Sequence, residues 1–444
     1  MRARAAVLAL ALVAALVGIS LPAAATASTP TAPTPVVVGN RIVDSRTNTT
    51  WVPHGANWPS FEYACSEGWG YSQDDDTNAA AAAMVSWGIN AIRIPLNQNC
   101  WLGSDSSDYG TAAGYQAAAA AWVGILNAHG IVVILDLHWS APTGQRASGQ
   151  WPMADANSVT FWKSVATAYA SDPSVIFDAF NEPYSTGAFT LSWSCWENGG
   201  CQAPLVTTDQ APVGCYNATT GACTYTVAGM SQLVAAIRAG GAKQPIMLGG
   251  LNYSNDLSGW LAHEPTDSDS TPQLIASWHN YPGQDLCGYT VACWNAATST
   301  VAASVPIITG EFGETDGGST DLTAYMNWAD AHGIGYLPWA WWDASGLTDP
   351  SDHDALLYAL YSGPNFTPQA PAGTAYKAHL AALPVPPSSR VLHTLPLVVA
   401  APSVGTSSVP LSTTDSRVDV LALSEPELQQ VALSTQLEPR ISTH

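Results

Sequence analysis

The chain has 444 residues, of which 47% are hydrophobic and 11% charged, and its formal net charge at pH 7 is −21. This composition excludes a chain that is kept disordered by high charge and low hydrophobicity. The negative charge repels nucleic acid and anionic membranes, so we expect neither as a partner, and a neutral substrate is favoured.

The first 27 residues have the pattern of a secretory signal peptide. Arg2 and Arg4 precede an apolar run from Val7 to Ile19, and Ala25-Thr26-Ala27 supplies the small residues of a cleavage site. The apolar run is shorter than the roughly 20 residues of a membrane-spanning helix, so an uncleaved anchor is the less favoured alternative. We therefore expect a secreted protein. Residues 28–36 (STPTAPTPV) predict a flexible leader.

Between residues 37 and 383, short β-branched or aromatic runs alternate with longer Ala-rich stretches. This pattern is typical of strands that are buried on both faces and connected by helices. The predicted strands are Trp51–Asn57, Ile89–Leu96, Ile131–His138, Val175–Asn181, Pro245–Leu251, Gln273–His279, Pro306–Glu311 and Gly335–Trp341. The predicted helices include Asp76–Trp87, Ala112–His129, Ser158–Tyr169, Val227–Ala239 and Leu322–His332.

Eight such units predict an α/β fold, a (β/α)8 TIM barrel with enlarged loops, which would form the catalytic domain over residues 37–383. A doubly wound open sheet is the alternative, but no GxGxxG phosphate loop follows the first strand. Residues 384–444 are rich in Pro, Ser and Thr and contain neither Trp nor Cys, so we expect a disordered tail. We expect a monomer.

The eight cysteines form four pairs of close sequence neighbours. The pairs are Cys65 and Cys100, Cys195 and Cys201, Cys215 and Cys223, and Cys287 and Cys293. In an exported chain this pattern favours disulfides that staple long loops, although their connectivity stays open. A zinc site is disfavoured because no CxxC pair or interleaved histidine has ligand spacing. The long insertion after the fourth strand, residues 184–226, is expected to wall the cleft.

Polar or aromatic residues end six of the predicted strands. In a barrel of this kind the active site lies where the carboxyl ends of the strands meet the following loops. The strand-ending pieces are Ile92-Arg93-Ile94-Pro95, Asp136-Leu137-His138, Phe180-Asn181-Glu182-Pro183, Trp278-His279-Asn280-Tyr281, Gly310-Glu311-Phe312 and Trp339-Ala340-Trp341. Structure alone does not explain such a set, so it predicts an active site.

Two carboxylates in this set point to cleavage of a glycosidic bond. That reaction needs one acid to protonate the leaving oxygen and one carboxylate to meet the oxocarbenium-like centre. Glu182 and Glu311, on strands four and seven, meet this need. A separation of roughly 5 Å would give retention of configuration, and one of about 6.5 to 9.5 Å would give inversion.

The neighbours of these glutamates have chemistry that suits supporting roles. Arg93 and Tyr281 are candidate stabilisers of Glu311, and Asn181 can donate to the sugar 2-hydroxyl. His138 and His279 can hold hydroxyls or the glutamates in register. A metal site made of these histidines and glutamates is disfavoured because neither HExxH nor a dense His/Asp cluster occurs. A serine hydrolase is disfavoured because no GxSxG elbow follows a strand.

In chain order, these strand-ending motifs resemble those of glycoside hydrolase family 5, the cellulase family. The resemblance covers roughly residues 37 to 383 and rests on six pieces. They are Arg93-Ile94-Pro95, Leu137-His138-Trp139, Asn181-Glu182-Pro183, His279 with Tyr281, Glu311-Phe312-Gly313 and Trp339-Ala340-Trp341.

The resemblance implies a (β/α)8 barrel, retention of configuration and no cofactor. It also implies that Glu182 is the general acid/base and Glu311 the nucleophile. Arg93, His138, Asn181, His279 and Tyr281 match further active-site positions of the family. The family's strand-eight Trp lies under the sugar, and both Trp339 and Trp341 point to one side of a strand with period two. Trp339 is favoured because the family's Trp is commonly followed by a small residue, as it is here by Ala340, and Trp341 is the alternative.

The expected activity is endo-hydrolysis of a β-1,4-linked polysaccharide, with cellulose or a soluble β-glucan as the first substrate. Mannanase, xylanase and transglycosylase activities remain alternatives, and a non-catalytic carbohydrate-binding barrel is disfavoured because both glutamates are present. Aromatic residues in the predicted loops are candidates for stacking on sugar rings. These are Trp58, Tyr63, Trp69, Trp101, Trp139, Trp151, Trp193, Trp196, Trp278 and Trp294.

Overall fold

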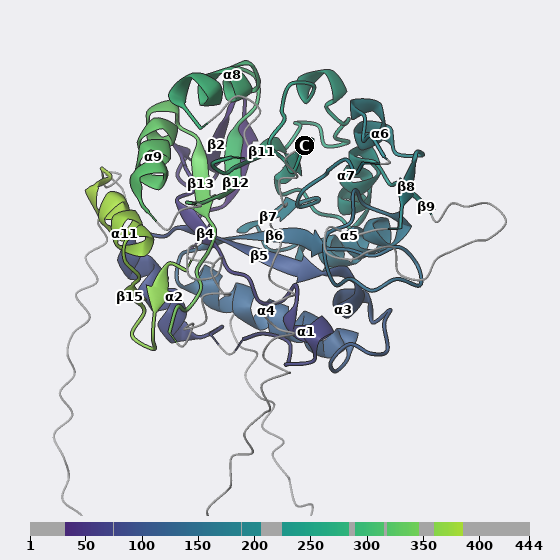
Figure 1. Cartoon of the computed structure of the whole chain (residues 1–444), viewed down its shortest axis with the longest axis horizontal. Coiled ribbons are helices and arrows are strands. Elements are labelled where there is room, and N and C mark those ends of the chain that lie inside the picture. The colour runs from purple at the N-terminus through teal and green to yellow at the C-terminus, as the bar shows by residue number, and fades with distance from the viewer. Residues whose placement is uncertain are drawn as a thin grey trace, which may run out of the picture.

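In the computed structural model, eight parallel strands form one sheet in the order β13-β12-β11-β10-β7-β6-β5-β4 (Figure 1). The structure describes residues 32–384 except 74, 188, 206–223, 284–288, 315–317 and 346–358. The strands are β4 (Gly55–Asn57), β5 (Ala91–Asn97), β6 (Val132–Trp139), β7 (Val175–Asp178), β10 (Ile246–Gly249), β11 (Leu274–Asn280), β12 (Ile307–Phe312) and β13 (Gly335–Pro338). Each of them lies in one of the eight predicted strands or within two residues of it.

The first and last strands of this sheet meet, which closes it into a barrel. His54, just before β4, bridges in parallel to Tyr336 of β13, whose amide donates to the carbonyl of Pro53 at 2.9 Å. At the other end of the pair, the amide of Trp341 donates to the carbonyl of Asn57 at 2.8 Å. The predicted (β/α)8 barrel is therefore confirmed.

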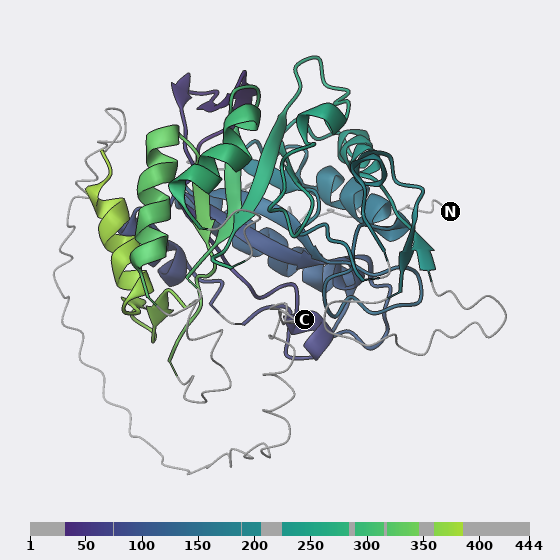
Figure 2. The same ribbon diagram turned by 45° about the horizontal axis from the view of Figure 1, so that its top comes forward.

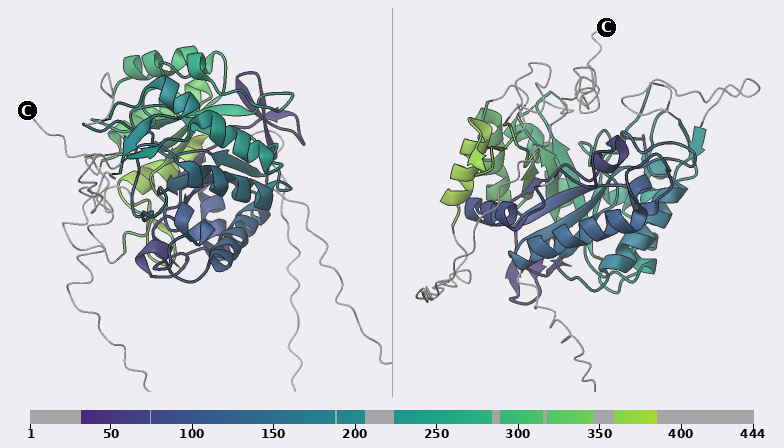
Figure 3. Two further views of the ribbon diagram at one scale, coloured as in Figure 1. Left: turned by 90° about the vertical axis from the view of Figure 1, so that its right-hand side faces the viewer. Right: turned by 90° about the horizontal axis from the view of Figure 1, so that it is seen from below.

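Helices surround the strands on the outside (Figures 2 and 3). The longer ones are α2 (Asn78–Trp87), α4 (Ala112–Ala128), α5 (Ala156–Tyr169), α7 (Met230–Ala239), α8 (Val291–Ala302), α9 (Thr320–His332) and α11 (Ala372–Ala382). Their ends follow capping rules: the Thr77 hydroxyl accepts from the amide of Ala80, and Asp155 forms a capping box with Ser158. Gly88 ends α2 in the left-handed conformation that glycine adopts without strain.

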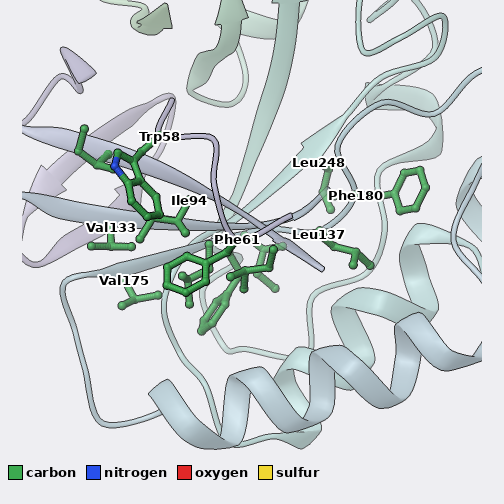
Figure 4. Close-up of a cluster of buried hydrophobic side chains, with 14 of the residues drawn as sticks. Trp58, Phe61, Ile94, Val133, Leu137, Val175, Phe180 and Leu248 are labelled. Carbon is green, nitrogen blue, oxygen red and sulfur yellow. The ribbon is translucent and has the colours of Figure 1, made fainter. Parts of the chain in front are cut away.

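Successive strand residues point alternately into the barrel and out toward the helices. Inward-facing apolar side chains form one cluster: Ala91, Val132, Ile134, Ile176, Met247, Ile275, Ile308 and Leu337, together with Val37, Ile42 and Trp51. Their chain neighbours Val133, Val175 and Leu248 belong to the larger outer cluster beneath the helices (Figure 4). This period of two explains why the strands read as continuous apolar runs in the sequence.

A small antiparallel sheet lies before the barrel in the chain, and two of its side chains join the inner cluster. It consists of β1 (Pro35–Val38), β2 (Arg41–Asp44) and β3 (Thr49–Thr50). The expected flexible leader over residues 28–36 is thus too long at its end. Pro35 and Val36 pair with β2, and the amide of Thr34 donates to Asp44 at 3.0 Å. Among the described residues, no helix is long and apolar enough to cross a membrane.

Disulfides staple the loops that follow the strands. Cys65 in the short helix α1 (Ala64–Glu67) bonds to Cys100 in α3 (Gln98–Leu102). Cys195 in α6 (Trp193–Asn198) bonds to Cys201. Cys293 is also disulfide-bonded, while Cys215, Cys223 and Cys287 lie outside the described residues.

The insertion after β7 has some structure of its own. It contains α6 and the two-stranded sheet of β8 (Gln202–Pro204) and β9 (Thr224–Thr226). The remaining short elements are the 3₁₀ helix η1 (Leu261–His263) and the pair β14 (Tyr361–Ser362) and β15 (Thr367–Pro368).

Candidate active site

The alternation that fills the barrel with apolar side chains also places charged ones at its carboxyl end. Arg93 comes two residues after inward-facing Ala91, Asp136 two after Ile134, and Asp178 two after Ile176. All three charged side chains are completely buried. The carboxyl end of the barrel is therefore a polar layer on an apolar interior.

Arg93 is the centre of this layer. Its Nε donates to Asp178 at 2.9 Å, and its Nη2 lies 3.0 Å from Asp136. Its Nη1 donates to Glu311 at 2.8 Å and to Asn57 at 2.9 Å. Burial lowers the pKa of the guanidinium, but the three carboxylates outweigh burial and raise that pKa above its ordinary value. Arg93 is therefore a fixed positive charge.

Glu311 ends β12 and receives donors at both carboxylate oxygens. Oε1 accepts from Arg93, and Oε2 accepts from the Tyr281 hydroxyl at 3.1 Å. Burial raises the pKa of Glu311, while His279 and Arg93 act in the opposite direction. The two expected stabilisers of Glu311 are thus in contact with it.

Glu182 follows β7 and is held by neutral donors. Its Oε1 lies 2.8 Å from Nδ1 of His279, and its Oε2 accepts from Nε2 of Gln150 at 3.0 Å. Burial raises the pKa of Glu182, and the Gln150 amide opposes that effect. Because no cation bonds to it directly among the described residues, Glu182 is better suited than Glu311 to carry a proton.

The two glutamates face one another across a short gap. A carboxylate oxygen of Glu182, one of Glu311 and a ring nitrogen of His279 all lie within 4.8 Å of one another. By spacing alone, these three groups could also hold a metal ion. Carboxyl groups of inverting glycosidases stand about 6.5–9.5 Å apart to admit a water, and those of retaining ones about 5–5.5 Å apart. So short an approach between one oxygen of each carboxylate favours the second class.

Both candidate histidines lie in the polar layer. Nδ1 of His138 lies 2.7 Å from Oδ2 of Asp136, whose pKa burial raises to about 7. Burial lowers the pKa of both His138 and His279 to about 4, so both rings are neutral near pH 7. Each Nδ1 then carries the hydrogen that it donates to a carboxylate. This fixes the orientation of both rings.

Asn181 presents a free donor toward the site. Its Oδ1 accepts from Nη2 of Arg93 at 2.7 Å, which fixes the orientation of the amide. Its Nδ2 is buried and has no hydrogen-bond partner among the described residues. An unpaired buried donor is costly unless a ligand satisfies it.

A comparison with known sequences identifies the family. The profile of the cellulase family, glycosyl hydrolase family 5, matches residues 43–345. The chain belongs to glycoside hydrolase family 5. This match contains all nine residues that the sequence singles out for the site, and it confirms the predicted family.

Individual relatives of this family 5 chain are distant. It is 23% identical over 278 residues to a mannan endo-1,4-beta-mannosidase from Streptomyces lividans, a match that covers 61% of this chain and 59% of that protein. Solved structures share the fold. A beta-glucanase from Saccharophagus degradans has a TM-score of 0.55 at 20% identity, covering 79% of this chain and 93% of that one. An endocellulase from the archaeon Pyrococcus horikoshii has a TM-score of 0.53 at 16% identity, covering 80% and 100%.

The two candidate tryptophans after β13 are not equivalent. The ring of Trp339 stacks on His138, with centroids 5.5 Å apart and planes inclined by 16°. Trp341 is only 1% exposed and packs against Trp87 and Tyr361 in the outer core. The expectation that both point to one side is wrong because β13 ends at Pro338, so a strand period does not apply beyond it. Trp339 therefore lies beside the polar layer at the carboxyl end of the barrel, whereas Trp341 does not.

Eight of the ten aromatic residues proposed for sugar stacking are buried in the core, and only Trp69 and Trp193 are more exposed. Those at most 2% exposed are Trp58, Trp101, Trp196, Trp278 and Trp294. Tyr63 and Trp139 are only 5% and 3% exposed. Tyr63 packs edge-on against Trp69, with ring centroids 5.5 Å apart, and in a tilted arrangement against Trp139, at 6.4 Å. Trp69 is 41% exposed. These three residues form an aromatic strip that runs from the end of β6 to the surface.

Sequence reasoning assigned no role to four residues of the site. Asn57 accepts from Arg93 and donates to the carbonyls of Gly310 and Leu337. Its position at the end of the first predicted strand was a usable signal. Asp136 and Asp178 were visible as charges inside apolar strands. Gln150 lies in the loop after β6, where no periodic pattern could have marked it.

Proposed function

We propose that this family 5 chain is a retaining endo-β-1,4-glycanase that uses Glu311 as nucleophile and Glu182 as general acid/base. The observation that carries the proposal is the close approach of the two glutamates, since one carboxylate oxygen of each lies within 4.8 Å of the other. Their different environments support the division of roles. Glu311 contacts a guanidinium and a phenol, which favour its charged form, whereas the direct donors to Glu182 are neutral.

In the first step, Glu311 attacks the anomeric carbon while Glu182 protonates the departing glycosidic oxygen. The sugar is then bonded to Glu311, and Glu182 is a carboxylate. In the second step, Glu182 takes a proton from water, the water oxygen bonds to the anomeric carbon, and Glu311 leaves. Nδ2 of Asn181 is free to donate to the sugar 2-hydroxyl, a contact that strengthens in the transition state.

The proposed substrate is a β-1,4-glucan, either cellulose or a soluble β-glucan. Trp69, the exposed member of the aromatic strip with Tyr63 and Trp139, offers a ring for the apolar face of a sugar. β-Mannan is the second candidate because the curated relative is named a mannan endo-1,4-beta-mannosidase. Xylan is the third candidate substrate. Transfer of the sugar from Glu311 to a sugar acceptor, in place of water, is the alternative reaction to be tested.

We also propose secretion, a monomer, and a catalytic domain over residues 37–383. Secretion rests on the signal-peptide pattern of residues 1–27 and agrees with the disulfides Cys65–Cys100 and Cys195–Cys201. Residues 384–444 are proposed to be dispensable for turnover of a soluble polymer. A truncation after residue 383 checks this, since a large loss of turnover would contradict it.

The test is product analysis on cellulose, β-glucan, mannan and xylan with wild type, Glu182→Gln and Glu311→Gln. Both variants should lose at least about 1000-fold in turnover, because each removes a group that acts in the transition state. Proton NMR of the first-formed anomer should report retained configuration. Near-normal rates in both variants, or an inverted product, would overturn the mechanism.

A further inference from the structure

Gln150 contacts Glu182 although it lies on a loop and not at a strand end. Its Nε2 donates to Oε2 of Glu182 at 3.0 Å, and the residue is only 7% exposed. The other carboxyl oxygen, Oε1, lies 2.8 Å from Nδ1 of His279. Each oxygen of the proposed acid/base thus has its own N–H donor. This arrangement suits the carboxylate form of Glu182, which accepts only.

We propose that Gln150 is a positioning residue that serves Glu182 in both of its protonation states. Its amide N–H donates a hydrogen bond to the carboxylate, and after rotation of the amide its Oε1 accepts a hydrogen bond from the O–H of the carboxylic acid. The inference rests on the proposed role of Glu182 as acid/base.

The chemistry of the two donors assigns the proton to the oxygen that faces Gln150. His279 is neutral near pH 7, and beside the ionised Glu182 its Nδ1 carries the hydrogen. As long as this tautomer is kept, His279 does not accept from Glu182 at that atom. An acidic hydrogen on Glu182 therefore belongs on Oε2. Oε1 of Gln150 is buried and has no hydrogen-bond partner among the described residues. Turning the amide by half a revolution exchanges its two ends and presents this free acceptor to Oε2.

Hydrogen bonds from the insertion after β7 fix the backbone of the Gln150 loop, whereas Oε1 of the Gln150 side chain has no hydrogen-bond partner among the described residues. The Tyr184 hydroxyl donates to the carbonyl of Gln150 at 2.9 Å, and the Tyr184 amide donates to the carbonyl of Pro152 at 3.0 Å. Tyr225 of β9 exchanges two hydrogen bonds with the backbone of Met153. The insertion after β7 thus braces the loop, and Tyr184 links it to the segment that carries Glu182.

The net effect of Gln150 is to lower the pKa of Glu182. A hydrogen bond to an ionised acceptor is roughly twice as strong as one between neutral groups, so Gln150 favours the carboxylate overall. It opposes the burial that raises the pKa of Glu182. The other charged or titratable groups near Glu182 come from four strands and stay in place in any Gln150 variant. They are Arg93 of β5, Asp136 and His138 of β6, His279 of β11 and Glu311 of β12.

The main test is the pH dependence of kcat/KM for Gln150→Met, which keeps the length of the side chain but removes the amide. The alkaline limb should move to higher pH by about half to one unit, and turnover of the polymer should fall about tenfold or more. A dinitrophenyl glycoside, whose leaving group needs no protonation, should lose much less in kcat/KM. Gln145→Met makes the same change in the same loop, away from Glu182, and should leave the limb in place.

A second variant keeps the proposal testable if Gln150→Met folds poorly. Gln150→Glu preserves shape and places a second carboxyl beside Glu182, so the two would share a proton and the alkaline limb should move up further than with Met. An unchanged limb and normal turnover in both variants would overturn the proposal. Loss of activity in Glu182→Gln alongside normal Gln150 variants removes only this inference, whereas a normal Glu182→Gln removes the proposed function itself.

Discussion

Nη1 of Arg93 lies 2.8 Å from Oε1 of Glu311, and both side chains are buried. The same guanidinium also contacts Asp136 and Asp178, so one cation serves three acidic side chains. Because Glu311 shares Arg93 with these two aspartates, its electrostatic environment depends on two completely buried carboxyl groups. The orientation of the proposed nucleophile is thus built into the barrel.

Removing the Arg93 charge should damage both stability and activity. Arg93→Met leaves buried acidic groups without their cation, and breaking a buried pair in this way costs about 3–5 kcal/mol in free energy of unfolding. Turnover should fall at least about 1000-fold in the fraction that folds. Urea unfolding and polymer hydrolysis check both effects. Arg146→Met is the control, since that arginine is half exposed and its ion pairs with Asp105 and Asp108 contribute at most about 1 kcal/mol. Equal effects of the two substitutions would contradict the assignment.

The barrel and most of the proposed site could be predicted from the sequence because both follow simple periodicities. Arg93, His138 and Glu311 lie on strands, where period two and parallel pairing bring the carboxyl ends together. Trp341 breaks the same rule because the strand ends before it. Gln150 depends on the path of a loop, which tertiary contacts from the distant Tyr184 and Tyr225 set. Such contacts have no local sequence signal.

Asn181→Ala tests the free amide donor beside the nucleophile. Its Nδ2 has no partner among the described residues, so we expect it to bind the sugar 2-hydroxyl and its loss to reduce kcat/KM about 100-fold. An aryl 2-deoxyglycoside lacks that hydroxyl. On this substrate the wild type and the variant should differ only slightly. An equal loss on both substrates would assign Asn181 to holding Arg93 instead.

Trp339 and Trp341 should give opposite phenotypes when each is replaced by Ala. Trp339 is half-buried and stacks on His138, so its loss should lower kcat/KM about 10- to 100-fold with a small change in stability. Trp341 is a core residue, so its loss should cost about 3–5 kcal/mol of stability and leave kcat/KM of the folded protein nearly unchanged. Thermal unfolding with kinetics well below Tm checks both. The reverse pattern would place Trp341 at the sugar.

The pH profile of kcat/KM should be bell-shaped, with both limbs above the ordinary range of a glutamate. Activity needs Glu311 ionised and Glu182 protonated, and burial raises the pKa of both. Activity is therefore lost as pH falls through the pKa of Glu311 and lost again as pH rises through that of Glu182. Glu182→Gln, assayed on a dinitrophenyl glycoside, should abolish the alkaline limb and keep the acid one. An alkaline limb that survives this substitution belongs to another group.

Gly310→Ala should disturb the site through His279. A Cβ at Gly310 would lie 2.9 Å from Nε2 of His279 and 2.8 Å from Oγ of Ser277, so the imidazole must shift from its position. Because Nδ1 of that ring holds Glu182, we expect at least a tenfold loss of kcat. Gly124→Ala in α4 is the matched control, since its Cβ would meet no atom within 4 Å. That change should leave kcat unchanged and add up to about 1 kcal/mol of stability from helix propensity. Full activity of Gly310→Ala would mean that Glu182 does not depend on the placement of His279.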